Sequence, residues 1–157
     1  RRAREKLPPL AIHPDLMKSA QAHSDYQASI GAMTHADPNG SIISRISKYG
    51  FKWSSAAENV AMRQKSVVEV VDDWFKSKVH LDNILSNNAY VGFGFRNGAW
   101  TQHFATPPKY KGKNNAQPPP SQCPGLSAQI SANIQLKGVL NLDFVGNAVN
   151  KIAHILN

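Results

Sequence analysis

The composition of the chain changes abruptly after residue 106, and this change limits how much of it can fold as one unit. Residues 107–125 are rich in proline and lysine. Proline removes backbone donors and favours extended, solvated chain, so we expect a linker there. The sequence therefore predicts a folded domain over residues 1–106, a linker over 107–125 and a tail over 126–157.

Three helices are predicted within the domain from their end signals. Pro14 can occupy the first turn of a helix that runs to about Ile30, because a proline there loses no hydrogen bond. Ser41 precedes apolar residues at helical spacing and predicts a second, short helix. Ser66 and Glu69 have the spacing of a capping box before an apolar helical face, which predicts a third.

The clearest strand signal surrounds the Asn-Gly pair at residues 97–98, which is typical of a two-residue hairpin turn. This turn would pair Phe95 with Trp100 on one face of the hairpin. The other face would carry Gly92 and Gly94, and it leaves room for another backbone, a side chain or a ligand. Helices that flank a small antiparallel sheet predict a layered α+β domain.

The tail has a different pattern. From Ile130 to Phe144 the even-numbered residues are apolar or small, which has the period of strands, and residues 145–156 return to helical spacing. We expect a hairpin and a helix that pack on the domain or on a second copy of the chain. An amphipathic element that inserts into a membrane surface is the alternative.

Charge and cysteine content exclude several classes of protein. The formal net charge is +8, but most of it lies in residues 1–6 and beyond residue 106, which disfavours specific binding of nucleic acid. The single cysteine, Cys123, excludes an internal disulfide framework. No apolar run approaches the roughly 18 residues of a membrane span, and no glycine-rich phosphate loop precedes a helix.

Three polar residues lie next to strongly structured segments: His35, Glu58 and His80. Two imidazoles and a carboxylate are suitable ligands for a zinc ion with one open position. Their separations of 23 and 22 residues differ from those of a helical His-Glu-x-x-His motif, which places its ligands on one face. On residue types alone, surface or internally satisfied histidines are the favoured interpretation.

Six fragments follow one another in order across residues 7–106. They are Met33-Thr34-His35; Arg45 with Tyr49-Gly50-Phe51-Lys52-Trp53; Ala57-Glu58-Asn59-Val60-Ala61; Val71-Asp72-Asp73-Trp74; His80-Leu81-Asp82-Asn83-Ile84-Leu85; and Val91-Gly92-Phe93-Gly94 with Trp100-Thr101-Gln102. Together these fragments resemble the CAP superfamily, which groups cysteine-rich secretory proteins, insect venom antigens and plant pathogenesis-related proteins. The cysteine-free domain is more similar to the bacterial and some fungal branches of this family.

The resemblance implies a three-layer α-β-α sandwich, secretion, and a central cleft with two histidines and two glutamates. His35, Glu58 and His80 match three of these positions, whereas Ser77 stands where the second glutamate is expected. Three ligands suffice for zinc with a bound water, and His103 is a further candidate. No cofactor is certain; zinc or another divalent cation is the candidate.

Three functions follow from this resemblance. The first is a secreted, non-enzymatic protein in pathogenesis or defence that binds a sterol or a fatty-acid-like lipid in an apolar pocket, with a membrane surface as a further partner. The second is a zinc hydrolase whose metal, held by His35, Glu58 and His80, activates water. In the third, the cleft is structural, Glu58 accepts hydrogen bonds from both imidazoles, and surface loops and the tail bind partners. The oligomeric state is left open.

Overall fold

The computed structural model describes residues 1–108, so the predicted tail, Cys123 and most of the predicted linker lie outside the described residues. The elements, in chain order, are η1 (Arg2–Glu5), β1 (Ala11–Ile12), α1 (Pro14–Ile30), α2 (Ile42–Lys48), β2 (Ser55–Met62), α3 (Val67–Lys76), α4 (Lys78–Ile84), β3 (Tyr90–Arg96) and β4 (Ala99–Thr106). None of the helices within residues 1–108 combines the length and apolar character needed to cross a bilayer.

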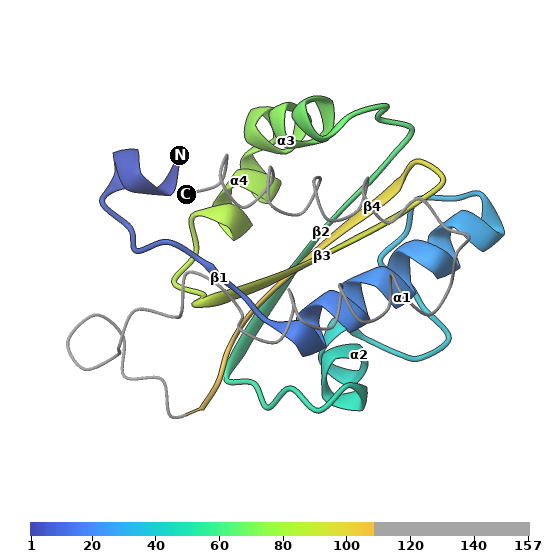
Figure 1. The fold of residues 1–157 in the computed structure, drawn as a ribbon, viewed down its shortest axis with the longest axis horizontal. Helices are drawn as coiled ribbons and strands as arrows, with labels where there is room; N and C mark the ends of the chain where they lie inside the picture. The colour runs from blue at the N-terminus through green and yellow to red at the C-terminus, as the bar shows by residue number, and fades with distance from the viewer. Residues whose placement is uncertain (109–157) are drawn as a thin grey trace, which may run out of the picture.

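The strands form one sheet with the order β1-β3-β4-β2, in which β2 is an edge strand. Figure 1 shows α1 and α2 on one side of this sheet and α3 and α4 on the other, which confirms the predicted α-β-α layers. The β3–β4 pair is antiparallel, as predicted for the hairpin, and β2, a strand that the sequence did not predict, pairs antiparallel with β4. The two-residue strand β1 adds a parallel pair with β3 that the sequence did not predict.

The local signals of the sequence are confirmed at the helix ends. Pro14 is the first residue of α1. Ser41 Oγ accepts a hydrogen bond from Ser44 N at 3.3 Å before α2. Ser66 Oγ accepts one from Glu69 N at 3.1 Å before α3, although the return bond of Glu69 goes to the backbone N–H of residue 65. Helix α4, which is only seven residues long, was not predicted.

The predicted hairpin is also confirmed. The turn residues at 97–98 both have positive φ, 47° and 82°, and Phe95 pairs with Trp100 with ring centroids 4.1 Å apart. On the other face of the hairpin, Gly92 pairs with His103 in the β3–β4 register.

Helix α1 closes this other face of the hairpin. A Cβ added to Gly92 would overlap the backbone of Leu16, and one added to Gly94 would overlap the backbone of Ala20. The sequence left open whether another backbone, a side chain or a ligand approaches these glycines. In the structure it is the backbone of α1. A ligand cannot approach the sheet at these two glycines.

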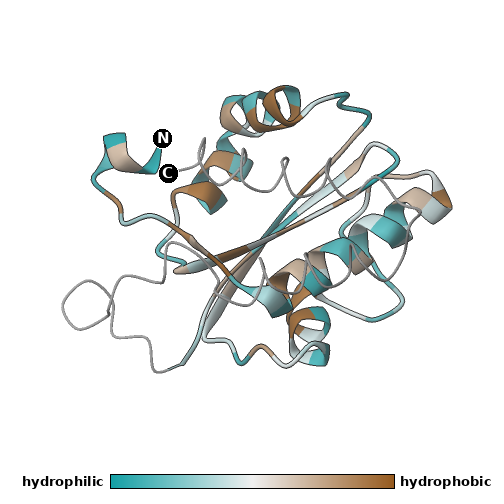
Figure 2. Cartoon of the chain, in the orientation of Figure 1, coloured by the Kyte–Doolittle hydropathy of each residue, from teal (hydrophilic) through white to brown (hydrophobic). Residues whose placement is uncertain are grey.

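The two sides of the sheet differ in polarity. The side under α3 and α4 is an apolar core, and Figure 2 shows strongly apolar residues on both helices. The members of this core that are at most 3% exposed are Val70, Val71, Trp74, Ile84, Val91, Phe93, Trp100 and Phe104. The side under α1 buries polar residues as well, among them Ser24, Gln27 and Thr101, which hydrogen-bond to one another across the layers. The buried imidazoles of His23 and His103 and the buried carboxylate of Glu58 lie on the α1 side, whereas the buried amides of Asn59 and Gln102 hydrogen-bond to each other on the other side.

Candidate functional site

The site is built around Glu58, which lies in the edge strand β2 and is 8% exposed. The register of β2 against β4 pairs it with His103, so both side chains point to the side of the sheet that α1 covers. A carboxylate buried in this way is stable only if neighbouring donors compensate for the lost hydration.

Three donors from three different segments surround Glu58. Oε2 accepts a hydrogen bond from His103 Nε2 at 2.7 Å and one from Arg45 Nη2 of α2 at 2.8 Å. Oε1 accepts a hydrogen bond at 2.7 Å from Nδ1 of His35, in the loop after α1. Both carboxylate oxygens of Glu58 are therefore occupied by protein donors.

A second carboxylate extends this network toward α1. Asp37 Oδ2 accepts from His23 Nδ1 at 2.8 Å, and Oδ1 accepts from the backbone N–H of Asn39 at 2.7 Å. His23 Nε2 lies 2.8 Å from the carbonyl oxygen of Thr34, to which it donates. Arg45 Nη1 lies 3.6 Å from Asp37 Oδ2 and links this group to Glu58. We call His23, Asp37, Arg45, Glu58 and His103 the buried polar cluster.

The electrostatics of the cluster favour ionised carboxylates. Burial opposes the ionisation of Glu58, but the interactions with His103, followed by the charge of Arg45 and the hydrogen bond from His35, outweigh it and lower the pKa of Glu58 to about 2. Burial also opposes the ionisation of Asp37, yet the hydrogen bonds from His23 and Asn39 lower its pKa. Complete burial lowers the pKa of His103, which favours a neutral ring that still donates from Nε2.

We expect acid to destabilise the domain in two steps. Below pH 6.5 the unfolded chain protonates His103, whereas the lowered pKa of His103 keeps the folded state from doing so. Between pH 4.5 and about 2 the unfolded chain protonates Glu58, whereas the lowered pKa of Glu58 keeps it ionised in the folded state. In both ranges the unfolded state binds more protons, so stability rises with pH.

Urea unfolding from pH 8 to pH 2 measures this dependence. Glu5→Gln, which removes an exposed carboxylate of η1, is the control and should leave the profile unchanged. A free energy of unfolding that stays constant from pH 7 to pH 3 would contradict the expectation.

The structure brings two of the three predicted metal ligands together. Glu58 and His35 are in contact, although the side chain of His35 is 62% exposed. His80 lies in α4, in the opposite helical layer. Burial, and after it the charge of His35, lower the pKa of His80. Within residues 1–108 no three His, Cys, Asp or Glu side chains are arranged to hold a metal ion.

The charges around Glu58 disfavour a resident divalent cation. The guanidinium of Arg45, 2.8 Å from Glu58 Oε2, would repel a cation bound to the same carboxylate. His35 also directs Nδ1 at Glu58, which leaves Nε2 as its only ring nitrogen for a ligand. Metal binding by His35, Glu58 and His80 therefore stays a prediction.

Sequence reasoning missed much of this network. His23 and Asp37 were not predicted, and Arg45 entered only as part of a motif. One signal could have indicated them: Ser19, His23 and Gln27 follow each other at intervals of four residues, so they form a polar stripe along one face of α1. A polar stripe on a helix needs a polar partner, and the odd-numbered residues of β4 provide it.

The fold and the site together define a class of protein. Its members are three-layer α-β-α domains that bury a cluster of carboxylates, imidazoles and a guanidinium. The family model of the CAP, or cysteine-rich secretory protein, family matches residues 1–106. The chain belongs to this family.

Individual relatives agree with this assignment. The chain is 36% identical to the uncharacterised protein YkwD of Bacillus subtilis over 107 residues, which are 66% of this chain and 42% of that protein. It is 26% identical to an extracellular protein of Bacillus anthracis that contains an SCP domain, with a TM-score of 0.64 over 66% of this chain and 36% of that one. The chain thus spans less than half the length of both proteins.

A more distant structure shares the fold alone. An outer surface protein of Borrelia burgdorferi is 20% identical, with a TM-score of 0.62 over 68% of this chain and 84% of that protein. Two of the similar structures are thus described as extracellular or outer-surface proteins.

Proposed function

We propose that this chain is a secreted, non-enzymatic CAP domain that binds a lipid at its surface and uses the buried polar cluster to hold its layers together. The observation that carries the proposal is the engagement of both carboxylate oxygens of Glu58, which accept hydrogen bonds from His35, Arg45 and His103. The extracellular and outer-surface similar structures support secretion.

The state of Glu58 supports a structural role over a catalytic one. A general base needs a pKa near the working pH and a free lone pair within reach of its substrate. The pKa of Glu58 is lowered to about 2, and its side chain is 4% exposed. The third hypothesis from the sequence, a structural cleft, has Glu58 accept hydrogen bonds from two imidazoles, those of His35 and His80. In the structure the two imidazoles that donate to Glu58 are those of His35 and His103.

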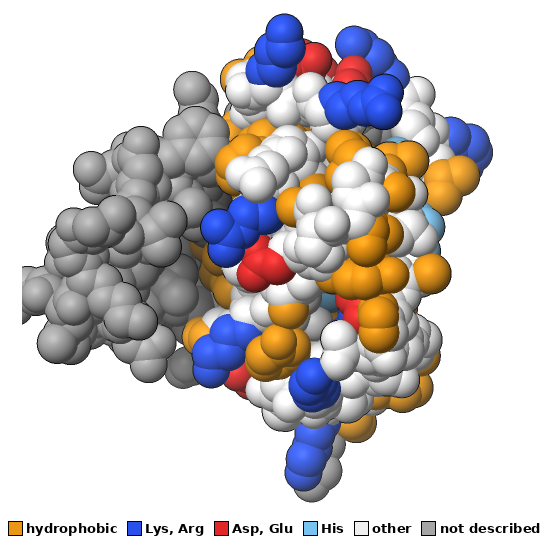
Figure 3. Space-filling model, turned by 90° about the vertical axis from the view of Figure 1, so that its right-hand side faces the viewer, with side chains coloured by type: hydrophobic (Ala, Val, Ile, Leu, Met, Phe, Trp, Pro, Cys, Tyr) orange, Lys and Arg blue, Asp and Glu red, His pale blue; other side chains and the backbone are white. Residues whose placement is uncertain are grey.

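A lipid would bind on the outside of the domain, because α1 closes the glycine-bearing face of the sheet. Ile30 and Met33 are 47% and 57% exposed where α1 ends and its following loop begins. The side of the molecule shown in Figure 3, at which α1 ends, carries apolar side chains between charged groups. Adjacent exposed apolar side chains of this kind favour an apolar ligand.

We expect saturable binding of labelled cholesterol or ergosterol at micromolar protein. Met33→Ser should weaken it at least about tenfold, because burial of a methionine side chain contributes about 1.5–3 kcal/mol. Val79→Ser is the matched control, since Val79 is 70% exposed on α4 and lies in the opposite helical layer. No saturable binding by the unaltered chain, or equal losses in both variants, would contradict a lipid site at the end of α1.

The metal-dependent alternative predicts a different result. We expect zinc-dialysed protein to retain less than one equivalent of zinc on elemental analysis, because Arg45 occupies the carboxylate that a cation would need. His80→Ala should then change neither zinc content nor activity against a peptide library. Retention of one zinc per chain, together with peptide cleavage that His80→Ala abolishes, would favour the hydrolase and overturn a non-enzymatic role.

A further inference from the structure

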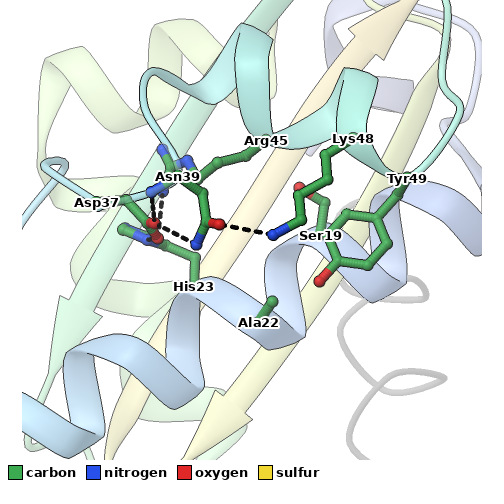
Figure 4. A pocket seen from close by; sticks show the side chains of 8 residues that line it. All are labelled: Ser19, Ala22, His23, Asp37, Asn39, Arg45, Lys48 and Tyr49. Carbon is green, nitrogen blue, oxygen red and sulfur yellow. Dashed lines mark hydrogen bonds and ion pairs between the residues drawn. The ribbon is translucent and has the colours of Figure 1, made fainter.

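A small pocket, which the sequence did not predict, lies between α1, α2 and the loop that joins them. Ser19 of α1 lines one side, and Arg45, Lys48 and Tyr49 at the end of α2 line the other (Figure 4). The cavity volume of ≈ 10 Å³ is room for about one water molecule or one ligand oxygen. Lys48 extends across the pocket toward Asn39, as Figure 4 shows.

The pocket contains buried donors without a hydrogen-bond partner among the described residues. These donors are Ser19 Oγ and Arg45 Nε; Arg45 Nη1 also lacks a hydrogen bond, but it lies 3.6 Å from Asp37 Oδ2. Ser19 is 1% exposed and Arg45 is 3% exposed. A buried donor that lacks an acceptor costs about 1–3 kcal/mol, so the pocket favours a ligand that supplies acceptor oxygens.

The charges around the pocket favour a ligand with a single negative charge. The ammonium of Lys48 donates to Asn39 Oδ1 at 2.6 Å and forms no ion pair with any residue from 1 to 108. It keeps two further N–H donors. Asp37 also lines the pocket, but its carboxylate already accepts hydrogen bonds from His23 and Asn39, so it does not require Lys48 as a donor. The carboxylates of Asp37 and Glu58 beside Arg45 would repel a dianion, such as hydrogen phosphate, more strongly than a monoanion.

We propose that this pocket binds a carboxylate group. One oxygen enters the cavity and accepts hydrogen bonds from Ser19 Oγ and Arg45 Nε, and the other accepts from Lys48 Nζ. The group is supplied by a small acid, by the C-terminus of a peptide or by an acidic sugar, which share this chemistry. This site is separate from the proposed lipid surface at the end of α1 and does not depend on it.

Titration of the full ¹⁵N-labelled chain with sodium acetate, at ionic strength held constant with sodium chloride, tests the proposal by amide chemical shifts. We expect saturable shifts confined to residues 37–40 and 45–49 and to the part of α1 around Ser19. Acetamide, which is neutral and of the same shape, should produce none. Phosphate should bind more weakly than acetate. Comparison of N-acetylalanine with glucuronate then distinguishes a peptide from a sugar as the source.

Two variants and a control separate binding from folding. Lys48→Met keeps the length of the side chain and should weaken acetate binding at least tenfold. Ser19→Ala should weaken it several-fold without lowering Tm, because the Ser19 hydroxyl has no hydrogen-bond partner in the fold. Lys52→Met removes an exposed lysine outside the pocket and should leave binding within twofold.

Several results would overturn the proposal. They are equal responses to acetate and acetamide, tighter binding of phosphate than of acetate, and unchanged acetate binding in Lys48→Met.

Discussion

Gly94→Ala is expected to destabilise the domain by at least about 3 kcal/mol, among the largest effects of any single substitution in it. The added Cβ would overlap the backbone of Ala20, and a helix backbone cannot move aside as a flexible side chain can. Relief would require α1 to lift from β3, which would also pull apart the contacts between α1 and β4. Urea unfolding of the variant, followed by circular dichroism, measures the loss.

Gly31→Ala is the control for this prediction. Gly31 has a φ of +65°, and a Cβ there meets nothing within 4 Å. Its substitution should therefore cost about 1 kcal/mol, from backbone conformation alone. If Gly94→Ala costs no more than Gly31→Ala, α1 does not pack on the strand as closely as described.

Glu58→Ala is expected to cost about 3–5 kcal/mol, because it leaves the guanidinium of Arg45 buried without its counter-charge. His103, which is completely buried, would lose its acceptor as well. His35→Ala is the matched comparison. It removes another donor to Glu58 but from a side chain that is 62% exposed, so about 1 kcal/mol or less is expected, with ligand binding intact.

A double substitution sharpens this test. Arg45→Met combined with Glu58→Met should be less destabilising than Glu58→Met alone, since replacing both members of a buried ion pair removes the uncompensated charge. A metal-binding role of Glu58 predicts a different effect of the single Glu58 substitution on stability. In metal-free protein, neutralising a carboxylate held ready for a cation would leave stability unchanged or raise it, and that outcome would contradict a structural cluster.

Features encoded within a few residues could be predicted without coordinates. Ser41 and Ser66 cap their helices because a side-chain oxygen lies next to the free amide three residues later, wherever the helix is placed. The turn at residues 97–98 likewise depends on its own two φ values, and it aligns the whole β3–β4 register. These two helix caps and this turn can therefore form whatever the positions of the other segments in the tertiary structure.

The candidate site was predictable only in part. Glu58 and His35 were expected to meet, and they do. His103 was a further candidate on the glycine-bearing face, and it proves to donate to Glu58 although 45 residues separate the two. His80 was expected beside them as a ligand; it lies on α4, and its role as a ligand stays a prediction.

Sequence alone therefore determined the helix caps, the hairpin and the layered α+β class of this protein, because each depends on hydrogen bonds or apolar periodicity within one segment. The tertiary structure alone decided which donors surround Glu58 and that α1 fills the glycine face. Those outcomes depend on the strand order and on the position of α1 across the sheet, which bring together groups from distant segments. The burial that results is what lowers the pKa of His103, and no spacing along the chain carries that information.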